Sequence, residues 1–168
     1  MNKDFDIVGD GDIASVIRSA EPKTAGLLFF ASGVSNSQET DENEYEREIE
    51  LLSMQDTKRH VVYFSSLSLF YYTNRYQDHK WQMETLVKEW FPKHTIVRLG
   101  NISWGDNPHT LINYLSNHPK APIRDEYRYV VDLPEFLHWM GLIPDWNCEM
   151  NVPGRMLKVK DIKERYCE

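Results

Sequence analysis

The chain has 168 residues, of which 41% are hydrophobic, and its formal net charge is −7. This length and apolar content suffice for one domain with a buried core. Nucleic acids and anionic membranes are bound through positive surface, and the sequence has no cluster of Lys or Arg. We therefore expect no nucleic-acid partner and no membrane partner.

Cysteine and histidine usage argues against a disulfide scaffold and against a metal site. The only cysteines are Cys148 and Cys167, and no two of the six histidines have the spacing of ligands on one helix face. The sequence has no apolar run long enough to span a bilayer, and its opening residues are polar and acidic. We expect a cytoplasmic protein without a metal.

The first part of the chain alternates strand and helix patterns. Residues 5–8 form a short β-type run that ends at Gly9, and residues 13–19 carry apolar side chains at helical spacing. Residues 27–30 are continuously apolar, which is typical of a strand covered on both faces. The pattern predicts a strand, a glycine turn, a helix and a second, parallel strand.

Residues 42–54 predict an amphipathic helix. Its apolar face carries Tyr45, Ile49 and Leu52. We interpret the acidic run over residues 41–50 as the solvated face of this helix. Residues 60–64 then predict a third strand, which leads into a serine-rich segment.

A long helix and a fourth strand follow. Asn74 is a suitable N-cap for a helix over residues 76–90, and Pro92 ends it, because proline cannot extend the hydrogen-bonding ladder. Residues 95–99 predict the next strand. Repeated strand and helix segments are expected for a parallel sheet wrapped on both faces.

The pattern loosens after Gly100. It predicts a helix that starts near Pro108 and runs to Leu115, a strand over residues 127–131 and a short helix over residues 133–140. No linker separates this part from the rest. We predict an α/β fold with a reduced Rossmann-like parallel sheet, helices on both faces and a small C-terminal cap. The expected division is a shortened Rossmann-like core (1–105) and a substrate-side cap (106–168) within one structural unit.

The turn at Gly9, Gly11 and Ala14 fits the dinucleotide pattern G-x-G-x-x-G/A, between a predicted strand and a predicted helix. Against this interpretation, Asp10 and Asp12 add negative charge where phosphates would lie. An acid about 20 residues further on, which would hold the ribose, is also missing. A cofactor-binding turn and a purely structural turn both remain open.

Tyr76 and Lys80 lie one helical turn apart and share a face with the apolar residues of the predicted helix. A nearby ammonium lowers the pKa of a phenol and makes it usable as a general acid or base. Ser65 and Ser66 end the preceding strand, so hydroxyl, phenol and ammonium groups can converge. In this arrangement the helix turns its polar face outward. That face carries Gln77, Glu84 and Lys88.

The order of these motifs resembles the extended short-chain dehydrogenase/reductases, the NAD-dependent epimerase/dehydratase family. The resemblance is carried by the glycine turn, the segment Val61-Val62-Tyr63-Phe64-Ser65-Ser66, the Tyr76-x-x-x-Lys80 pair, Ile96-Val97-Arg98-Leu99-Gly100-Asn101, Ile123-Arg124-Asp125 and Tyr129-Val130-Val131-Asp132-Leu133. It implies that Ser66 polarises the substrate oxygen, that Tyr76 exchanges its proton, and that Lys80 lowers the Tyr76 pKa and holds the nicotinamide ribose.

The same resemblance implies NAD or NADP as cofactor and a nucleotide-sugar as substrate. The implied cofactor-binding residues are Gly9, Gly11, Asp12, Ile13, Ala31, Ser32, Gly33, Tyr76 and Lys80. The implied substrate-binding residues are Ser66, Asn101 and Arg124. The family often pairs subunits through the helices that correspond here to residues 42–54 and 76–90, which implies a homodimer.

The chain departs from this family before residue 27, where there is no room for the second and third strands and their helices. The adenosine-binding half is therefore truncated. The first hypothesis is an NAD(P)-dependent oxidoreductase, epimerase or dehydratase that acts on a carbinol carbon. The alternatives are a non-catalytic relative that binds a ligand or serves in an assembly, and a purely structural domain.

Overall fold

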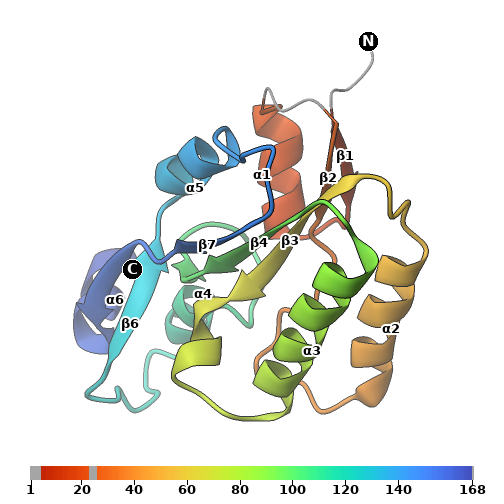
Figure 1. Cartoon of the computed structure of the whole chain (residues 1–168). Coiled ribbons are helices and arrows are strands. Elements are labelled where there is room, and N and C mark those ends of the chain that lie inside the picture. Colours follow the sequence, from red (N-terminus) through yellow and green to blue (C-terminus); the bar gives the residue numbers. More distant parts are fainter. Residues whose placement is uncertain (1–4, 23–25, 168) are drawn as a thin grey trace.

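The main sheet consists of five parallel strands in the order β1-β2-β3-β4-β7 (Figure 1). The computed structural model describes residues 5–22 and 26–167. The strands are β1 (Phe5–Val8), β2 (Leu27–Phe30), β3 (His60–Ser66), β4 (His94–Leu99) and β7 (Cys148–Val152). The first four confirm strands predicted from the sequence.

Helices cover both faces of this sheet (Figure 1). Alternate strand residues point to opposite faces, and each set packs with different helices. One face packs with α1 (Asp12–Ala20) and α5 (Leu133–Met140), and the other packs with α2 (Glu42–Ser53) and α3 (Arg75–Trp90). The fold is therefore the predicted Rossmann-like α/β arrangement, with two hydrophobic layers on one parallel sheet.

The strand β1 forms one edge of the sheet. It pairs in parallel with β2, so that Phe5 lies opposite Leu27 and Val8 lies opposite Phe30. In the described part of the chain, no strand pairs with the other side of β1. This agrees with the predicted truncation, since the strands of an adenosine-binding half would extend the sheet beyond β1.

A second, three-stranded sheet forms the smaller layer at the C-terminal side. It contains β5 (Asn101–Ile102), β6 (Tyr127–Val131) and β8 (Arg155–Lys158) in that order. The helices α4 (Leu111–Asn117) and α6 (Val159–Tyr166) pack together on it. Their small core consists of Ile112, Leu115, Val130, Val159 and Ile162.

Two helix starts show how local capping sets the boundaries. Asn74 caps α3 as predicted, because its side chain accepts a hydrogen bond from the Gln77 backbone N–H. The helix α4 begins later than predicted, at Leu111, because Thr110 is its cap and accepts from the Asn113 N–H. A short 3₁₀ helix, η1 (Leu67–Phe70), connects β3 to α3.

Candidate functional site

The parallel sheet brings the carboxyl ends of its strands to one edge, where open α/β sheets bind ligands. Gly9 follows β1, residues 31–33 follow β2, and Ser66 ends β3. Asn101 begins β5, one residue after β4 ends. The predicted catalytic and cofactor residues of these segments therefore share one edge, whereas Arg124 lies in the segment before β6.

The two glycines of the β1–α1 turn have different environments. Gly9 has a φ of +118°, and a Cβ there would collide with the carbonyl of Ala31, whose N–H donates to Val8 O at 2.8 Å. Glycine is therefore required here by the close approach of two strand ends. Gly11 has open space where a Cβ would be, and Ile13 packs against the core.

The Asp12 carboxylate holds a loop from the far side of the sheet. It accepts backbone N–H hydrogen bonds from Asp106 at 3.0 Å and from Asn107 at 3.1 Å. Gly105 has a φ of +95° and packs so closely against Asp12 that a Cβ would not fit. Asn107 Nδ2 also donates to Ser35 Oγ at 2.9 Å. The loop is thus held both by α1 and by the segment that follows β2.

This arrangement does not fit a complete dinucleotide. Such a ligand places its diphosphate at the first turn of α1, where Asp12 already presents a carboxylate and Asp10 adds a second in the turn. Like charges would repel the phosphates. The described sheet also ends at β1 and offers no strand to carry the adenosine.

Behind this edge lies a network of buried charged and polar groups. Lys80 on α3 is only 3% exposed, and its Nζ donates to Glu48 Oε1 at 3.2 Å and to the Tyr63 hydroxyl at 3.4 Å. The Tyr63 hydroxyl donates to the same Glu48 oxygen at 2.9 Å. His79 Nε2 pairs with the other oxygen, Oε2. Glu48 therefore binds three buried partners at once.

The charges of this network stabilise one another against burial. Burial alone would raise the pKa of Glu48, but Lys80 and His79 outweigh it and lower the pKa to about 2. Burial would lower the pKa of Lys80, but Glu48 outweighs it and raises that pKa. Burial and then Glu48 raise the pKa of Tyr63 well above its ordinary value. Glu48 is therefore a carboxylate, and Lys80 is an ammonium.

Gly33 covers this ion pair. A Cβ at residue 33 would lie 2.5 Å from Glu48 Oε1 and 2.7 Å from Lys80 Nζ. A larger residue at this position would therefore have to displace the Glu48 carboxylate and the Lys80 ammonium. Beneath this backbone, Glu48 compensates the charge of Lys80 inside the protein.

Of the predicted catalytic residues, Tyr76 and Lys80 lie close together. Lys80 Nζ is 5.6 Å from the centroid of the Tyr76 ring, which packs with Val34 and Tyr45. Ser66 is half-buried and caps η1 by accepting from the Ser68 N–H at 3.1 Å. In the described part of the chain, no hydrogen bond joins Ser66 to Tyr76 directly.

Two further predicted site residues, Ser32 and Asn101, have intramolecular contacts of their own. Ser32 accepts from Arg47 through both its hydroxyl and its carbonyl, each at 3.2 Å. Asn101 Nδ2 donates to Tyr129 O at 2.9 Å and thereby joins β5 to β6. Arg124 is exposed.

A cation and an aromatic ring connect the smaller layer to the main sheet near Arg124. The Arg128 guanidinium lies 4.8 Å from the centroid of the Tyr72 ring and pairs with Glu126 at 2.6 Å. The Tyr72 hydroxyl donates to Glu126 at 3.4 Å. Burial raises the pKa of Tyr72, and Arg128 and Arg124 oppose that shift. Arg128 therefore lies over one aromatic side chain and is paired with one carboxylate.

The interpretation of all acids in residues 41–50 as solvated is wrong for Glu48, which is fully buried. Glu48 lies three residues after Tyr45 and four before Leu52, and therefore on the apolar face of α2. That position was the available signal. An acid on an apolar stripe requires a buried cation, and Lys80 on the next helix supplies it.

The prediction that Gln77 and Glu84 face outward is also wrong, since both are buried, whereas Lys88 is exposed as expected. Glu84 accepts two hydrogen bonds from Arg98 on β4, at 2.8 and 2.6 Å. Gln77 binds Ser68 of η1. The helix α3 is therefore packed on a second, polar face.

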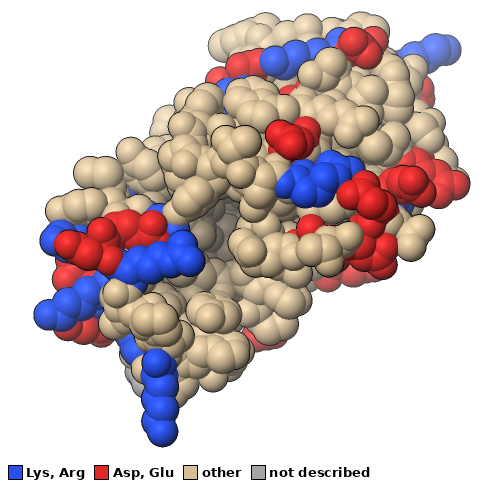
Figure 2. Space-filling view, turned by 90° about the horizontal axis from the view of Figure 1, so that it is seen from below, with Lys and Arg blue, Asp and Glu red and all other residues tan. Residues whose placement is uncertain are grey.

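One side of the face shown in Figure 2 is mainly acidic. Acidic side chains gather over α2, at the right of the view, where Glu42, Glu46 and Glu50 are exposed. At the opposite side, Lys and Arg lie among Asp and Glu. No helix in the described ranges is long and apolar enough to cross a membrane, and no three metal-ligating side chains cluster within them.

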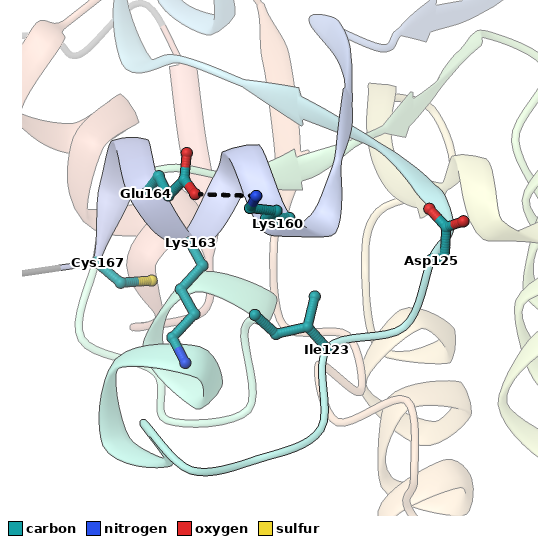
Figure 3. Close-up of a pocket in the computed structure, with 6 residues that line it drawn as sticks. All are labelled: Ile123, Asp125, Lys160, Lys163, Glu164 and Cys167. Carbon is teal, nitrogen blue, oxygen red and sulfur yellow. Dashed lines mark ion pairs between the residues drawn. The ribbon is translucent and has the colours of Figure 1, made fainter.

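A cavity of about 540 Å³ lies in the smaller layer, between α6 and the chain that leads to β6 (Figure 3). Its lining residues are Ile123, Asp125, Lys160, Lys163, Glu164 and Cys167. Lys160 pairs with Glu164 at 3.8 Å, and Lys163 donates to the carbonyl of Pro119 at 2.5 Å. The cations of this cavity are therefore engaged, and none of the predicted site residues lines it.

Comparison with known proteins supports the fold at low sequence identity. No family model and no curated protein matches the sequence. The capsular polysaccharide assembling protein CapF from Staphylococcus aureus is 15% identical, with a TM-score of 0.69. The match covers 96% of this chain and 57% of that chain.

Two further solved structures also resemble this chain in fold at low sequence identity. The enzyme WbmG from Bordetella bronchiseptica, in complex with NAD and UDP, is 12% identical with a TM-score of 0.63, over 91% of this chain and 60% of that one. The dTDP-glucose 4,6-dehydratase from Bacillus anthracis, in complex with NAD, is 12% identical with a TM-score of 0.62, over 90% and 59%. The chain thus spans less than two thirds of the length of these proteins and shares their fold.

Proposed function

We propose that this chain is a nucleotide-sugar-binding protein built on a shortened dehydrogenase fold, and that it does not transfer hydride with a dinucleotide bound to itself alone. The observation that carries this proposal is the ion pair of Lys80 with Glu48 beneath Gly33. In the related enzyme family, the corresponding lysine is expected to bind the nicotinamide ribose. Here a carboxylate already compensates its charge.

The cost of separating this pair supports the proposal. Removing one partner from a buried ion pair leaves an uncompensated charge in a medium of low dielectric constant, which is strongly unfavourable. A ribose hydroxyl is neutral and cannot replace the carboxylate. Lys80 is therefore expected to stay with Glu48 when a ligand binds, and the Asp12 contacts at α1 oppose a diphosphate there.

The nucleotide-sugar class is supported by what the chain retains. WbmG was solved with UDP, and a UDP-N-acetylglucosamine 4-epimerase from Methanobrevibacter ruminantium was solved with UDP-N-acetylmuramic acid. This chain keeps Ser66 at the carboxyl edge and the layer that carries Arg124 and Arg128. Arg128 is paired with Glu126, whereas the guanidinium of Arg124 is exposed and suits a diphosphate.

Calorimetric titration tests this proposal. We expect UDP and UDP-sugars to bind, and neither NAD(H) nor NADP(H) to bind at millimolar concentration. Arg124→Ala should weaken UDP binding, because it removes a phosphate partner, whereas the control Arg165→Ala on exposed α6 should not. Binding of NAD with no binding of UDP would overturn the proposal.

The enzyme hypothesis remains the second candidate, and one observation favours it: Lys80 Nζ lies 5.6 Å from the Tyr76 ring. In this case Ser66, Tyr76 and Lys80 would act on a carbinol carbon of the sugar. Tyr76→Phe would then abolish turnover of UDP-sugars with NAD(P) while it leaves binding nearly intact, because only the proton donor is lost. Turnover that persists in this variant would exclude the assignment.

A further inference from the structure

A row of hydrogen bonds connects the start of α3 to the carboxyl end of β3. Gln77 Nε2 donates to Ser68 Oγ at 2.9 Å, and Ser68 Oγ lies 2.8 Å from Ser66 Oγ. Ser66 Oγ also accepts the Ser68 backbone N–H at 3.1 Å. The row therefore leads from a buried amide to a serine at the edge where ligands bind in such sheets.

One hydroxyl hydrogen of Ser66 and Ser68 has no acceptor in this row. An amide nitrogen has no lone pair to accept with, so Ser68 Oγ must accept from Gln77. The two serine hydroxyls together hold two hydrogens, and their mutual hydrogen bond uses one of them. Within the described residues, the second hydrogen has no acceptor. Ser66 and Ser68 are both half-buried, so this donor can reach a ligand.

The burial of Gln77 indicates that its polar amide group has a role. Its side chain is 2% exposed, and its Oε1 has no partner in the described part of the chain. An unsatisfied buried polar atom is unfavourable, and an apolar residue of similar size would avoid this cost. The opposite amide orientation would bury unpaired N–H groups instead, which proteins tolerate less well than unpaired carbonyls.

We propose that Gln77 is a positioning residue that makes the Ser66 and Ser68 pair a hydrogen-bond donor to an oxygen of the bound sugar. This inference rests on the proposed function and adds a positioning residue to the Ser66 contact that the family resemblance implies. The sugar oxygen that the pair recognises is an acceptor, either a carbonyl or a hydroxyl that accepts. Gln77 acts through the serines and does not touch the ligand.

The test replaces the hydrogen-bond donor at residue 77 with an acceptor. Gln77→Glu replaces the amide with a carboxylate that can only accept, so it draws the free hydroxyl hydrogen towards α3 and leaves the serines without a donor. The control is Gln82→Glu, which makes the same change on the exposed face of α3. Gln77→Met is the second variant, since it removes the amide without burying a charge.

Affinities for UDP and for a UDP-sugar are measured by calorimetry in every variant. We expect Gln77→Glu to weaken UDP-sugar binding about tenfold, the scale of one lost hydrogen bond, and to leave UDP binding unchanged. Gln77→Met leaves the spare hydroxyl hydrogen in place and only frees its direction, so it should weaken UDP-sugar binding less than Gln77→Glu does, and Gln82→Glu should change neither ligand. In a Ser66→Ala background, Gln77→Glu should cause no additional loss, because the two residues act as one unit.

An equal loss of UDP and UDP-sugar affinity in the Gln77 variants would show a merely structural role and overturn the inference, and so would unchanged selectivity. These results differ from failure of the proposed function, in which the wild-type chain itself binds neither UDP nor a UDP-sugar. In that case the inference falls with the function on which it rests.

Discussion

Lys80 and Glu48 form an ion pair inside the protein, with Nζ 3.2 Å from Oε1 and neither residue more than 3% exposed. The pair joins α3 to α2 on one face of the sheet. It gives the burial of Lys80 an explanation that needs no ligand. The following predictions test this pair and the other contacts at the carboxyl edge.

Removing the carboxylate should strongly destabilise the fold. Glu48→Gln leaves the Lys80 ammonium buried without a compensating charge, and we expect the free energy of unfolding to fall by about 3 kcal/mol or more. Urea denaturation followed by circular dichroism measures this loss. Glu46→Gln, an exposed acid on the same helix, is the matched control and should change stability by less than about 0.5 kcal/mol. Equal effects of the two variants would contradict the importance of the pair.

The lowered pKa of Glu48 predicts how the stability of the protein depends on pH. The pKa of Glu48 falls from its ordinary value of 4.5 to about 2 in the folded protein, so its contribution is complete above pH 4.5 and is lost as pH falls towards 2. The stability difference between wild type and Glu48→Gln should therefore shrink over this range. Denaturation curves at several pH values measure it. A difference that stays constant down to pH 2 would show that Glu48 is not the titrating group.

The contact of Gly33 with the ion pair predicts that a larger residue here destabilises the protein, because it must displace the two charged groups. Gly33→Ala would place a methyl group 2.5 Å from Glu48 Oε1 and 2.7 Å from Lys80 Nζ, and we expect a loss of about 2 kcal/mol through overpacking. Gly11→Ala is the control, because open space surrounds its Cβ position. Thermal unfolding compares the two variants. A Gly33→Ala protein as stable as Gly11→Ala would disprove the close contact.

The contacts of Asp12 with the loop at Asp106 and Asn107 predict local protection. Asp12→Ala should make the amide hydrogens of these two residues exchange about tenfold faster or more, since each loses a charged acceptor. Asp10→Ala removes the same charge from the same turn without touching the loop and should leave the exchange unchanged. Hydrogen exchange followed by NMR resolves both sites. Equal protection in the two variants would show that Asp12 does not hold the loop.

The predicted homodimer can be tested through its charge. If two copies pair through α2 and α3, they bring together the exposed acids Glu42, Glu46 and Glu50. Salt screens such repulsion over distances of about 10 Å at 0.1 M. The dimer fraction measured by light scattering should therefore rise with ionic strength. A monomer at micromolar concentration at every salt concentration would exclude this dimer.

The sequence predicts the first hundred residues well, because their apolar residues recur at the spacing of buried strands and amphipathic helices. It does not predict β7, β8 or α6. The strand β7 reads Cys-Glu-Met-Asn-Val, and Glu149 and Asn151 leave no continuous apolar run. This strand lies at the edge of the sheet, pairs only with β4 among the described strands, and leaves those two side chains exposed. Its position depends on the tertiary structure rather than on local pattern.

Only part of the candidate site can be predicted from the sequence, because one partner of its ion pair lies on another helix. The burial of Tyr76 and Lys80 follows from the apolar face of α3. The partner of Lys80 does not follow from that helix, since Glu48 lies on α2 within a run of acids that resembles a solvated surface. Its place on the apolar stripe distinguishes Glu48 from its neighbours. Pairing between two separate helices becomes visible only when both pack on the sheet.

The order of strands in the main sheet also has a consequence for how the chain folds. The strands β1 to β4 follow one another in space as they do in sequence, and only β7 pairs with a strand that lies far earlier in the chain. Pairing of distant segments costs more loop-closure entropy and is slow. The segment from β1 to β4 is thus expected to assemble first and to serve as the template on which β7 docks, so that the C-terminal layer arrives last.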